Sequence, residues 1–313
     1  LFAYRRTPMK QPISPNTVAL PGPFEHVMLH TRGIRLHAVV AGDPRDPLVL
    51  LIHGTFGAWL DFRHVIGPLA QEGFHVAAVD MRGYGMSDKP PSRPGDDTLL
   101  AVGDIDGMIT ALGHERAHLV GHDTGGALSW VYSAAYPHRV DSLVAVSAAH
   151  PYDLRSYMRR RPWQLIYMTT RVAIGRLPSW FLRWFAGAIP QVWRSELTIN
   201  TQPGFHRSDA FTETLALRVQ AASIHNALRG IIHNSRMLTP KLISLPNKAN
   251  ANAPTLAPVL LIHPPQDVWT RIDELSSART RGPLARTSIP GAKNVPHVEN
   301  PQGFVEALTT FLT

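Results

Sequence analysis

The stretch AHLVGHDTGG, residues 117–126, constrains the fold of this chain more than any other part of the sequence. A short apolar run ends in a Gly-x-x-x-Gly pattern with Asp123 at its centre. The glycines let the backbone turn sharply from a strand into a helix. Such a turn lifts one side chain out of the sheet, next to the N–H groups that open the helix. The stretch therefore predicts a strand, a tight turn that presents Asp123, and a helix.

The carboxylate of Asp123 is suited to attack on a saturated carbon. Attack on an acyl carbon would give an anhydride, whereas attack on a saturated carbon gives an ordinary ester, which water can later cleave. A nucleophilic carboxylate therefore indicates the opening of an epoxide or the displacement of a halide, rather than the hydrolysis of a peptide or an ester.

Strand and helix patterns alternate on both sides of this turn. Apolar or alternating runs predict strands at residues 26–29, 34–40, 47–53, 75–80, 117–121, 142–148 and 258–263. Helical spacing and end signals predict helices at residues 65–73, 97–113, 126–136 and 301–312. The alternation indicates an α/β fold with a mainly parallel central sheet flanked by helices.

The alternation stops between His150 and Pro258, which predicts an inserted segment. We expect an N-terminal arm at residues 1–23, a core at 24–150 and 255–313, and a helical cap with its return linker at 151–254. Residues 151–240 contain twelve arginines, no lysine and four acidic residues, in a chain of net charge +8. Such a basic and aromatic cap would allow peripheral contact with an anionic membrane surface. The alternative interpretation is a solvated cap whose aromatic residues pack on the core.

Composition limits the remaining classes of protein. The chain has 313 residues and is 44% hydrophobic, enough for a sizeable core, and it has no cysteine for a disulfide framework or a thiol mechanism. No apolar run reaches the roughly 18 residues that span a bilayer, and the first twenty residues lack the apolar segment of a signal peptide. We expect a cytoplasmic protein with a small-molecule substrate and no nucleic-acid partner; a homodimer remains open.

An ester on Asp123 needs a base that activates water, and the base needs an acid that orients it. Asp267 follows the predicted strand at 258–263, and His297 lies just before the last predicted helix. The order nucleophile, acid, histidine is that of hydrolases with this turn. Asp153, after the strand at 142–148, is the alternative acid.

These features together resemble the α/β-hydrolase superfamily, in particular the epoxide hydrolases and the related haloalkane and haloacetate dehalogenases. The resemblance rests on residues 53–56 (HGTF), 79–88 (VDMRGYGMSD), 121–126 (GHDTGG), Asp267 and His297. It implies that Asp123 is the nucleophile, His297 the water-activating base and Asp267 its partner. It also implies an oxyanion hole formed by the backbone N–H groups of Thr55 and Thr124. No metal or organic cofactor is expected.

The sequence departs from epoxide hydrolases at two places. They usually have proline where Phe56 stands, which places Phe56 beside the substrate in a differently shaped loop. They also usually carry two cap tyrosines that donate to the epoxide oxygen. Here Tyr167, one helical turn after Gln164, and His233 are the candidates, with Gln164 and His225 as alternatives.

Two other functions stay open. A haloalkane or haloacid dehalogenase would use the same three residues, although Thr124 stands where some of these enzymes have a halide-binding tryptophan. A hydrolase-like binding protein without activity would normally have lost part of the triad. The stretch at 114–118 matches the zinc pattern H-E-x-x-H, but it runs into a predicted strand, where the two imidazoles would not converge.

Overall fold

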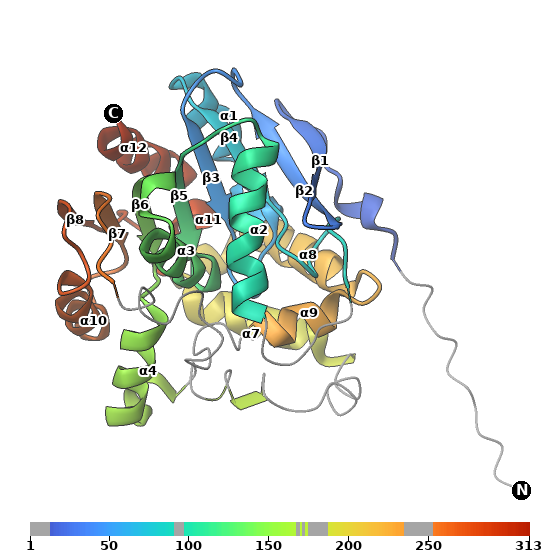
Figure 1. Ribbon diagram of the computed structural model, residues 1–313. Helices are drawn as coiled ribbons and strands as arrows, with labels where there is room; N and C mark the ends of the chain where they lie inside the picture. Colours follow the sequence, from blue (N-terminus) through green and yellow to red (C-terminus); the bar gives the residue numbers. More distant parts are fainter. Residues whose placement is uncertain (1–12, 91–96, 167–169, 171–172, 175–186, 235–252) are drawn as a thin grey trace, which may run out of the picture.

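One mostly parallel sheet forms the centre of the molecule (Figure 1). The computed structural model describes residues 13–90, 97–166, 170, 173–174, 187–234 and 253–313. The strands are β1 (Glu25–Thr31), β2 (Ile34–Ala41), β3 (Leu48–Ile52), β4 (His75–Val79), β5 (Ala117–His122), β6 (Val140–Val146), β7 (Val259–Ile262) and β8 (Leu284–Thr287). They lie in the order β1-β2-β4-β3-β5-β6-β7-β8. β2 pairs antiparallel with β1 and β4, and the other neighbours are parallel.

The burial of the strands explains why the sequence revealed most of them. Every residue of β3, β4 and β7 is buried, as expected for central parallel strands covered on both faces. The strands predicted at 26–29 and 34–40 are confirmed as β1 and β2, which pair antiparallel. β8 was not predicted because this edge strand has only four residues, none of them fully buried, and no apolar run.

Helices cover both faces of the sheet. α2 (Asp97–Ala111) and α3 (Thr124–Ala135) lie on one face, and α1 (Ile66–Gln71), α11 (Pro296–Glu299) and α12 (Pro301–Leu312) lie on the other (Figure 1). α10 (Asp267–Ser277), which was not predicted, packs against α4 (Pro151–Arg160). The α/β fold class predicted from the sequence is confirmed.

A group of helices lies beyond the carboxyl ends of the strands (Figure 1). It contains α7 (Ile189–Asn200), α8 (Asp209–Ser223) and α9 (Ala227–Asn234), and each of these helices packs against the next. Elsewhere in the described chain, short 3-10 helices are η1 (Pro15–Val18), η2 (Trp59–Phe62), η3 (Pro137–Arg139), η4 (Pro162–Leu165) and η6 (Phe205–Arg207). Within the predicted cap and its return linker, residues 175–186 and 235–252 fall outside the described residues. Among the helices that are described, none is long and apolar enough to cross a membrane.

Candidate active site

Asp123 stands at a strained turn between β5 and α3. Its φ of 50° and ψ of −113° are unusual for a residue with a side chain, and such strain is common at functional sites. The glycines around it are required by close packing, because a Cβ on Gly125 would lie 2.4 Å from the carbonyl oxygen of Ile52. A Cβ on Gly121 would lie 2.5 Å from the nitrogen of Gly126. The structure thus contains the strand, sharp turn and helix that the motif predicts.

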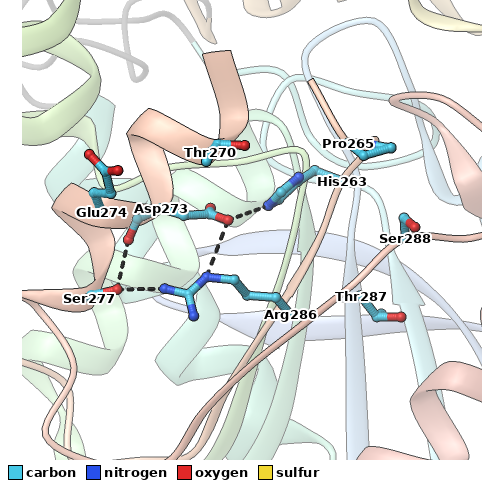
Figure 2. Close-up of a pocket in the computed structure, with 9 residues that line it drawn as sticks. All are labelled: His263, Pro265, Thr270, Asp273, Glu274, Ser277, Arg286, Thr287 and Ser288. Atoms are coloured by element: carbon cyan, nitrogen blue, oxygen red, sulfur yellow. Dashed lines mark hydrogen bonds and ion pairs between the residues drawn. The ribbon is translucent and has the colours of Figure 1, made fainter. Parts of the chain in front are cut away.

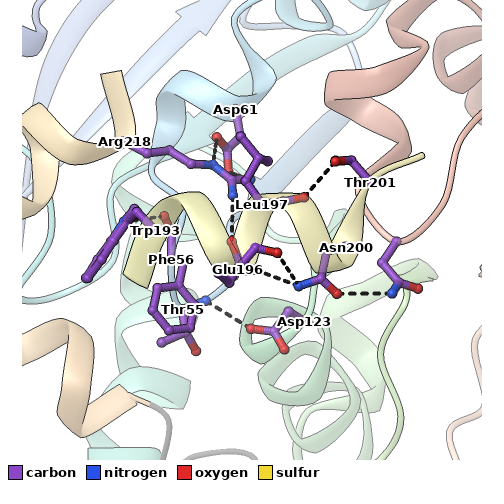
Figure 3. A network of polar contacts seen from close by, with 12 residues as sticks. Thr55, Phe56, Asp61, Asp123, Trp193, Glu196, Leu197, Asn200, Thr201 and Arg218 are labelled. Carbon is purple, nitrogen blue, oxygen red and sulfur yellow. Dashed lines mark hydrogen bonds and ion pairs between the residues drawn. The ribbon is translucent and has the colours of Figure 1, made fainter. Parts of the chain in front are cut away.

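The loop after β3 supplies a hydrogen-bond donor to Asp123. The backbone N–H of Thr55 donates to Asp123 Oδ2 at 3.0 Å, as drawn in Figure 3. Tyr84 Oη donates to the Thr55 carbonyl at 3.0 Å, and the hydroxyls of Thr55 and Thr124 are 3.2 Å apart. One carboxylate oxygen is therefore held beside the predicted oxyanion hole. Thr124 is the first residue of α3, where backbone N–H groups have no partner within the helix.

Phe56, the next residue of this loop, contacts the cap. Its carbonyl oxygen accepts a hydrogen bond from Trp193 Nε1 at 3.1 Å, and the two rings meet edge to face at 4.9 Å between centroids. Phe56 is half-buried and Trp193, in α7, is buried. The side chain that we expected beside the substrate therefore packs against α7 of the cap.

A network of buried ion pairs joins the cap to the core, and it was not predicted from the sequence. Arg218 of α8 binds Asp61 of η2 through two hydrogen bonds of 2.9 Å, and its third nitrogen binds Glu196 of α7 at 3.0 Å. All three side chains are buried (Figure 3). The three residues come from distant segments with no common spacing, so no local pattern announces them.

His297 does not make the hydrogen bonds expected of a base. Its side chain is 0% exposed, and neither ring nitrogen has a hydrogen-bond partner. The ring stacks on Phe62 at 4.6 Å and meets the ring of His122 at 4.8 Å and that of Phe304 at 5.7 Å. Burial holds the pKa of His297 well below its usual range, and His122 and Arg218 act in the same direction. Among the described residues, His297 therefore pairs with no acid; the side chain of Asp267 lies outside them, so the pairing with Asp267 stays a prediction.

The two candidate acids lie in different surroundings. Asp267 is the first residue of α10, directly beyond the carboxyl end of β7, and its side chain is outside the described part of the molecule. Asp153 of α4 forms an ion pair with Arg279. Burial raises the pKa of Asp153, and the pairing with Arg279 opposes that rise. Asp153 is therefore engaged with a cation rather than with His297.

Comparison with known proteins identifies the family. Residues 47–253, more than half of the chain, match the family model described as the alpha/beta hydrolase fold. The chain belongs to the α/β-hydrolase fold family.

The similar proteins include several epoxide hydrolases. Epoxide hydrolase 3 of Xenopus tropicalis is 33% identical over 178 residues, which is 57% of this chain and 48% of that protein. Epoxide hydrolase B of Mycobacterium tuberculosis is 39% identical over 124 residues, which is 39% of this chain and 35% of that protein. The chain thus spans about half or less of the length of these relatives.

Solved structures share the fold of this α/β hydrolase over nearly its whole length. Epoxide hydrolase A of Mycobacterium thermoresistibile superposes with a TM-score of 0.77 at 24% identity, covering 92% of this chain and 98% of that one. Epoxide hydrolase VrEH1 of Vigna radiata gives 0.74 at 22%, covering 93% and 98%. At these identities the likeness concerns the fold alone.

Most of the cap side chains that we expected to donate to the substrate lie outside the described part of this α/β hydrolase. Tyr167 lies outside the described residues, and so do the side chains of His233, in α9, and Gln164, in η4. His225 is exposed in the turn between α8 and α9. The assignment of Tyr167 and His233 as proton donors stays a prediction.

A separate pocket of about 650 Å³ opens at the carboxyl ends of β7 and β8 (Figure 2). Three of its polar side chains contact one another: His263 Nε2 lies 2.7 Å from Asp273 Oδ2, and Arg286 Nε lies 3.3 Å from the same oxygen. Arg286 also donates to Ser277 Oγ at 2.6 Å. These bonds hold α10 against the ends of the two strands.

The zinc pattern at 114–118 does not form a metal site. The ring of His114 contacts His75 at 2.8 Å, whereas His118, in β5, lies 2.8 Å from Ser142 Oγ. Within the ranges that the structure describes, no group of three or more histidine or acidic residues could hold a metal ion. The two imidazoles thus have different partners, as their position before a strand suggested.

Proposed function

We propose that this α/β hydrolase opens an epoxide with Asp123 as the nucleophile. The observation that carries the proposal is the carboxylate at the strained turn, with Oδ2 held by the N–H of Thr55 at 3.0 Å. A carboxylate held at such a turn is positioned to form an ester at a saturated carbon. The epoxide hydrolases among the similar proteins support the same chemistry.

The first step forms one bond and breaks another. Asp123 Oδ1 attacks the less hindered ring carbon, the carbon–oxygen bond of the ring breaks, and its electron pair stays on the oxygen. That oxygen takes a proton from a donor in the cap, for which Tyr167 and His233 are the candidates. The product is a hydroxyalkyl ester on Asp123.

The second step returns the carboxylate. Water loses a proton as its oxygen adds to the ester carbonyl, and the backbone N–H groups of Thr55 and Thr124 stabilise the resulting oxyanion. The oxyanion then collapses, the bond from the carbonyl carbon to the alkyl oxygen breaks, and that oxygen takes the proton back and leaves as part of a vicinal diol. The resemblance to epoxide hydrolases assigns the activation of this water to His297, oriented by Asp267. That assignment is a prediction, and the surroundings of His297 do not favour it.

The substrate that suits the described surroundings is apolar. Phe56 directly follows Thr55, whose N–H donates to Asp123, and its ring packs against Trp193. The buried cation of the cap, Arg218, already binds the carboxylates of Asp61 and Glu196, which counts against a second use as the binder of an anionic halo-acid. We therefore expect an apolar epoxide rather than a charged substrate.

The test is intact mass spectrometry and product analysis with panels of epoxides and haloalkanes. We expect the wild-type chain to gain the whole mass of an epoxide or to release its diol, and Asp123→Asn to do neither. Asp43→Asn, an exposed carboxylate paired with Arg45, is the matched control and should behave as wild type. An added mass equal to that of a haloalkane less one hydrogen halide would make the protein a dehalogenase. An adduct in Asp123→Asn would show that Asp123 is not the nucleophile.

A further inference from the structure

Asn294, three residues before His297, makes three side-chain hydrogen bonds to distant segments of the chain. It is half-buried in the loop between β8 and α11. Its Oδ1 accepts from Trp269 Nε1 at 3.2 Å and from Ser147 Oγ at 3.3 Å. Its Nδ2 donates to Asn200 Oδ1 at 3.0 Å.

These partners bring Asn294 close to the two segments that carry the nucleophile and the candidate acid. Ser147 directly follows Val146, whose carbonyl accepts from the N–H of Asp123 at 3.1 Å. Trp269 lies in α10, two residues after Asp267. A general base must stand between the atom that it activates and the acid that orients it. In this chain an amide side chain lies in that region.

The loop is fixed in this position by the cap. The N–H of Asn294 donates to the carbonyl of Asn200 at 2.9 Å. The carboxylate of Glu299, beyond His297, accepts from the N–H of Gln202 at 2.6 Å and from the N–H of Lys293 at 2.7 Å. Both sides of His297 are therefore tied to the end of α7, and the ring stays between Phe62 and Phe304.

An amide cannot replace the missing imidazole. The oxygen of an asparagine side chain has two lone pairs and accepts hydrogen bonds, but it does not take a proton from water near neutral pH. Both lone pairs of Asn294 Oδ1 already face donors, Trp269 and Ser147. His297 has the basic group, but its side chain is 0% exposed, and neither ring nitrogen bonds to an acidic side chain among the described residues.

We propose that Asn294 occupies the position of the water-activating base, so that the chain captures its substrate as a long-lived ester on Asp123. The inference rests on the proposed epoxide opening. The ester forms as written above, with the ring oxygen protonated and all atoms of the epoxide retained. Its hydrolysis then proceeds without general-base assistance, which is typically worth about 10²–10⁴-fold in rate. His297 is a packing residue of the core.

The experiment compares four folded proteins: wild type, Asn294→His, Asn294→Gln and His297→Phe. Each is incubated with an epoxide from the panel, freed of excess epoxide, and followed by intact mass spectrometry while the adduct decays. Asn294→Gln changes the side chain without supplying a base, and His297→Phe keeps an aromatic ring between Phe62 and Phe304. Circular dichroism and thermal unfolding establish that each variant is folded.

We expect a persistent adduct in wild type, Asn294→Gln and His297→Phe. In Asn294→His the decay should be faster by about 10²-fold or more, with an inflection near the imidazole pKa of about 6.5. Should Asn294→His not fold, equal and slow decay in wild type and His297→Phe supports the inference.

Other results overturn it. A wild-type protein that clears its ester at every turnover, and loses this ability in His297→Phe, would make His297 the base. A folded Asn294→His that decays as slowly as Asn294→Gln would show that residue 294 does not face the ester. If no protein forms an adduct or a diol with any epoxide, the proposed function itself fails and the inference falls with it.

Discussion

His37 and His297 are both 0% exposed, yet their surroundings are opposite. His37, in β2, uses both ring nitrogens: Nδ1 lies 2.8 Å from Asp80 Oδ2 and Nε2 lies 2.9 Å from His26 Nδ1. His297 uses neither nitrogen and is held by the rings of Phe62, His122 and Phe304. One histidine organises polar groups, whereas the other fills space.

The comparison shows that burial alone does not give a histidine a chemical role. Burial by itself would raise the pKa of Asp80, but the hydrogen bond from His37 and the nearby imidazoles lower it instead. The same carboxylate accepts from the N–H groups of Trp59 and Met86 at 3.1 Å and 3.0 Å. Hydrogen bonds thus make the surroundings of His37 specific for histidine, whereas a ring of similar size would satisfy those of His297.

The largest effect should come from breaking the polar cluster at its centre. Asp80→Ala leaves His37 and the two backbone N–H groups without their buried acceptor. We expect the free energy of unfolding to fall by about 4 kcal/mol, as for other broken buried pairs. Urea unfolding measures it. A loss below about 1 kcal/mol would mean that water or a shifted side chain replaces the carboxylate.

A smaller loss should follow when only the imidazole is removed. His37→Phe keeps a ring but leaves Asp80 without its histidine donor, while the Trp59 and Met86 donors remain. We expect a loss of about 3 kcal/mol at neutral pH. The double variant with Asp80→Ala should lose less than the sum of the two single changes, because the residues are in contact. Additive losses would contradict the described hydrogen bond.

The pH dependence of stability should test whether His297 is neutral in the folded protein. The pKa of His297 is well below its usual range, so between that pKa and about 6.5 the unfolded chain binds a proton that the folded chain does not. This group therefore lowers the free energy of unfolding as the pH falls below about 6.5, by up to about 1.4 kcal/mol per pH unit. Unfolding of wild type and His297→Phe at pH 7 and pH 5 should show a shallower decline for the variant. Equal slopes would mean that His297 is protonated in the folded protein.

The smallest effect is expected for His297→Phe at pH 8. The change removes two buried nitrogens without partners and keeps an aromatic ring of similar size, so the stability should stay within about 1 kcal/mol of wild type. A loss comparable to that of His37→Phe would reveal hydrogen bonds to His297 in solution and would bring back its assignment as a base.

The strands and the turn at Asp123 could be predicted because their signals are local. Apolar runs marked the buried strands, and the glycines around Asp123 marked the turn. β8 was not predicted because the strand is short and lies at the edge of the sheet. α10 was not predicted because its first residue, Asp267, was interpreted as a candidate acid and not as the start of a helix. The Asp61–Arg218–Glu196 cluster could not be predicted, since its members meet only through the packing of the cap.

The histidine loop shows where sequence reasoning stops. The order of residues along the chain places His297 after Asp267 and before the last helix, but it does not say which side chain of this loop makes polar contacts. Asn294 and His297 are three residues apart. Asn294 bonds to Asn200, Trp269 and Ser147, whereas His297 packs against aromatic rings, and the bonds of the loop to Asn200 and Gln202 hold this arrangement.

The sequence by itself determined the fold class and the turn at Asp123, because backbone sterics and the burial of apolar runs act over a few neighbouring residues. Only the tertiary structure decided that His297 lies between aromatic rings, that Asn294 contacts Trp269 and Ser147, and that Arg218 joins the cap to the core. These outcomes depend on hydrogen bonds and ring contacts between segments far apart in the chain, whose geometry no local pattern contains.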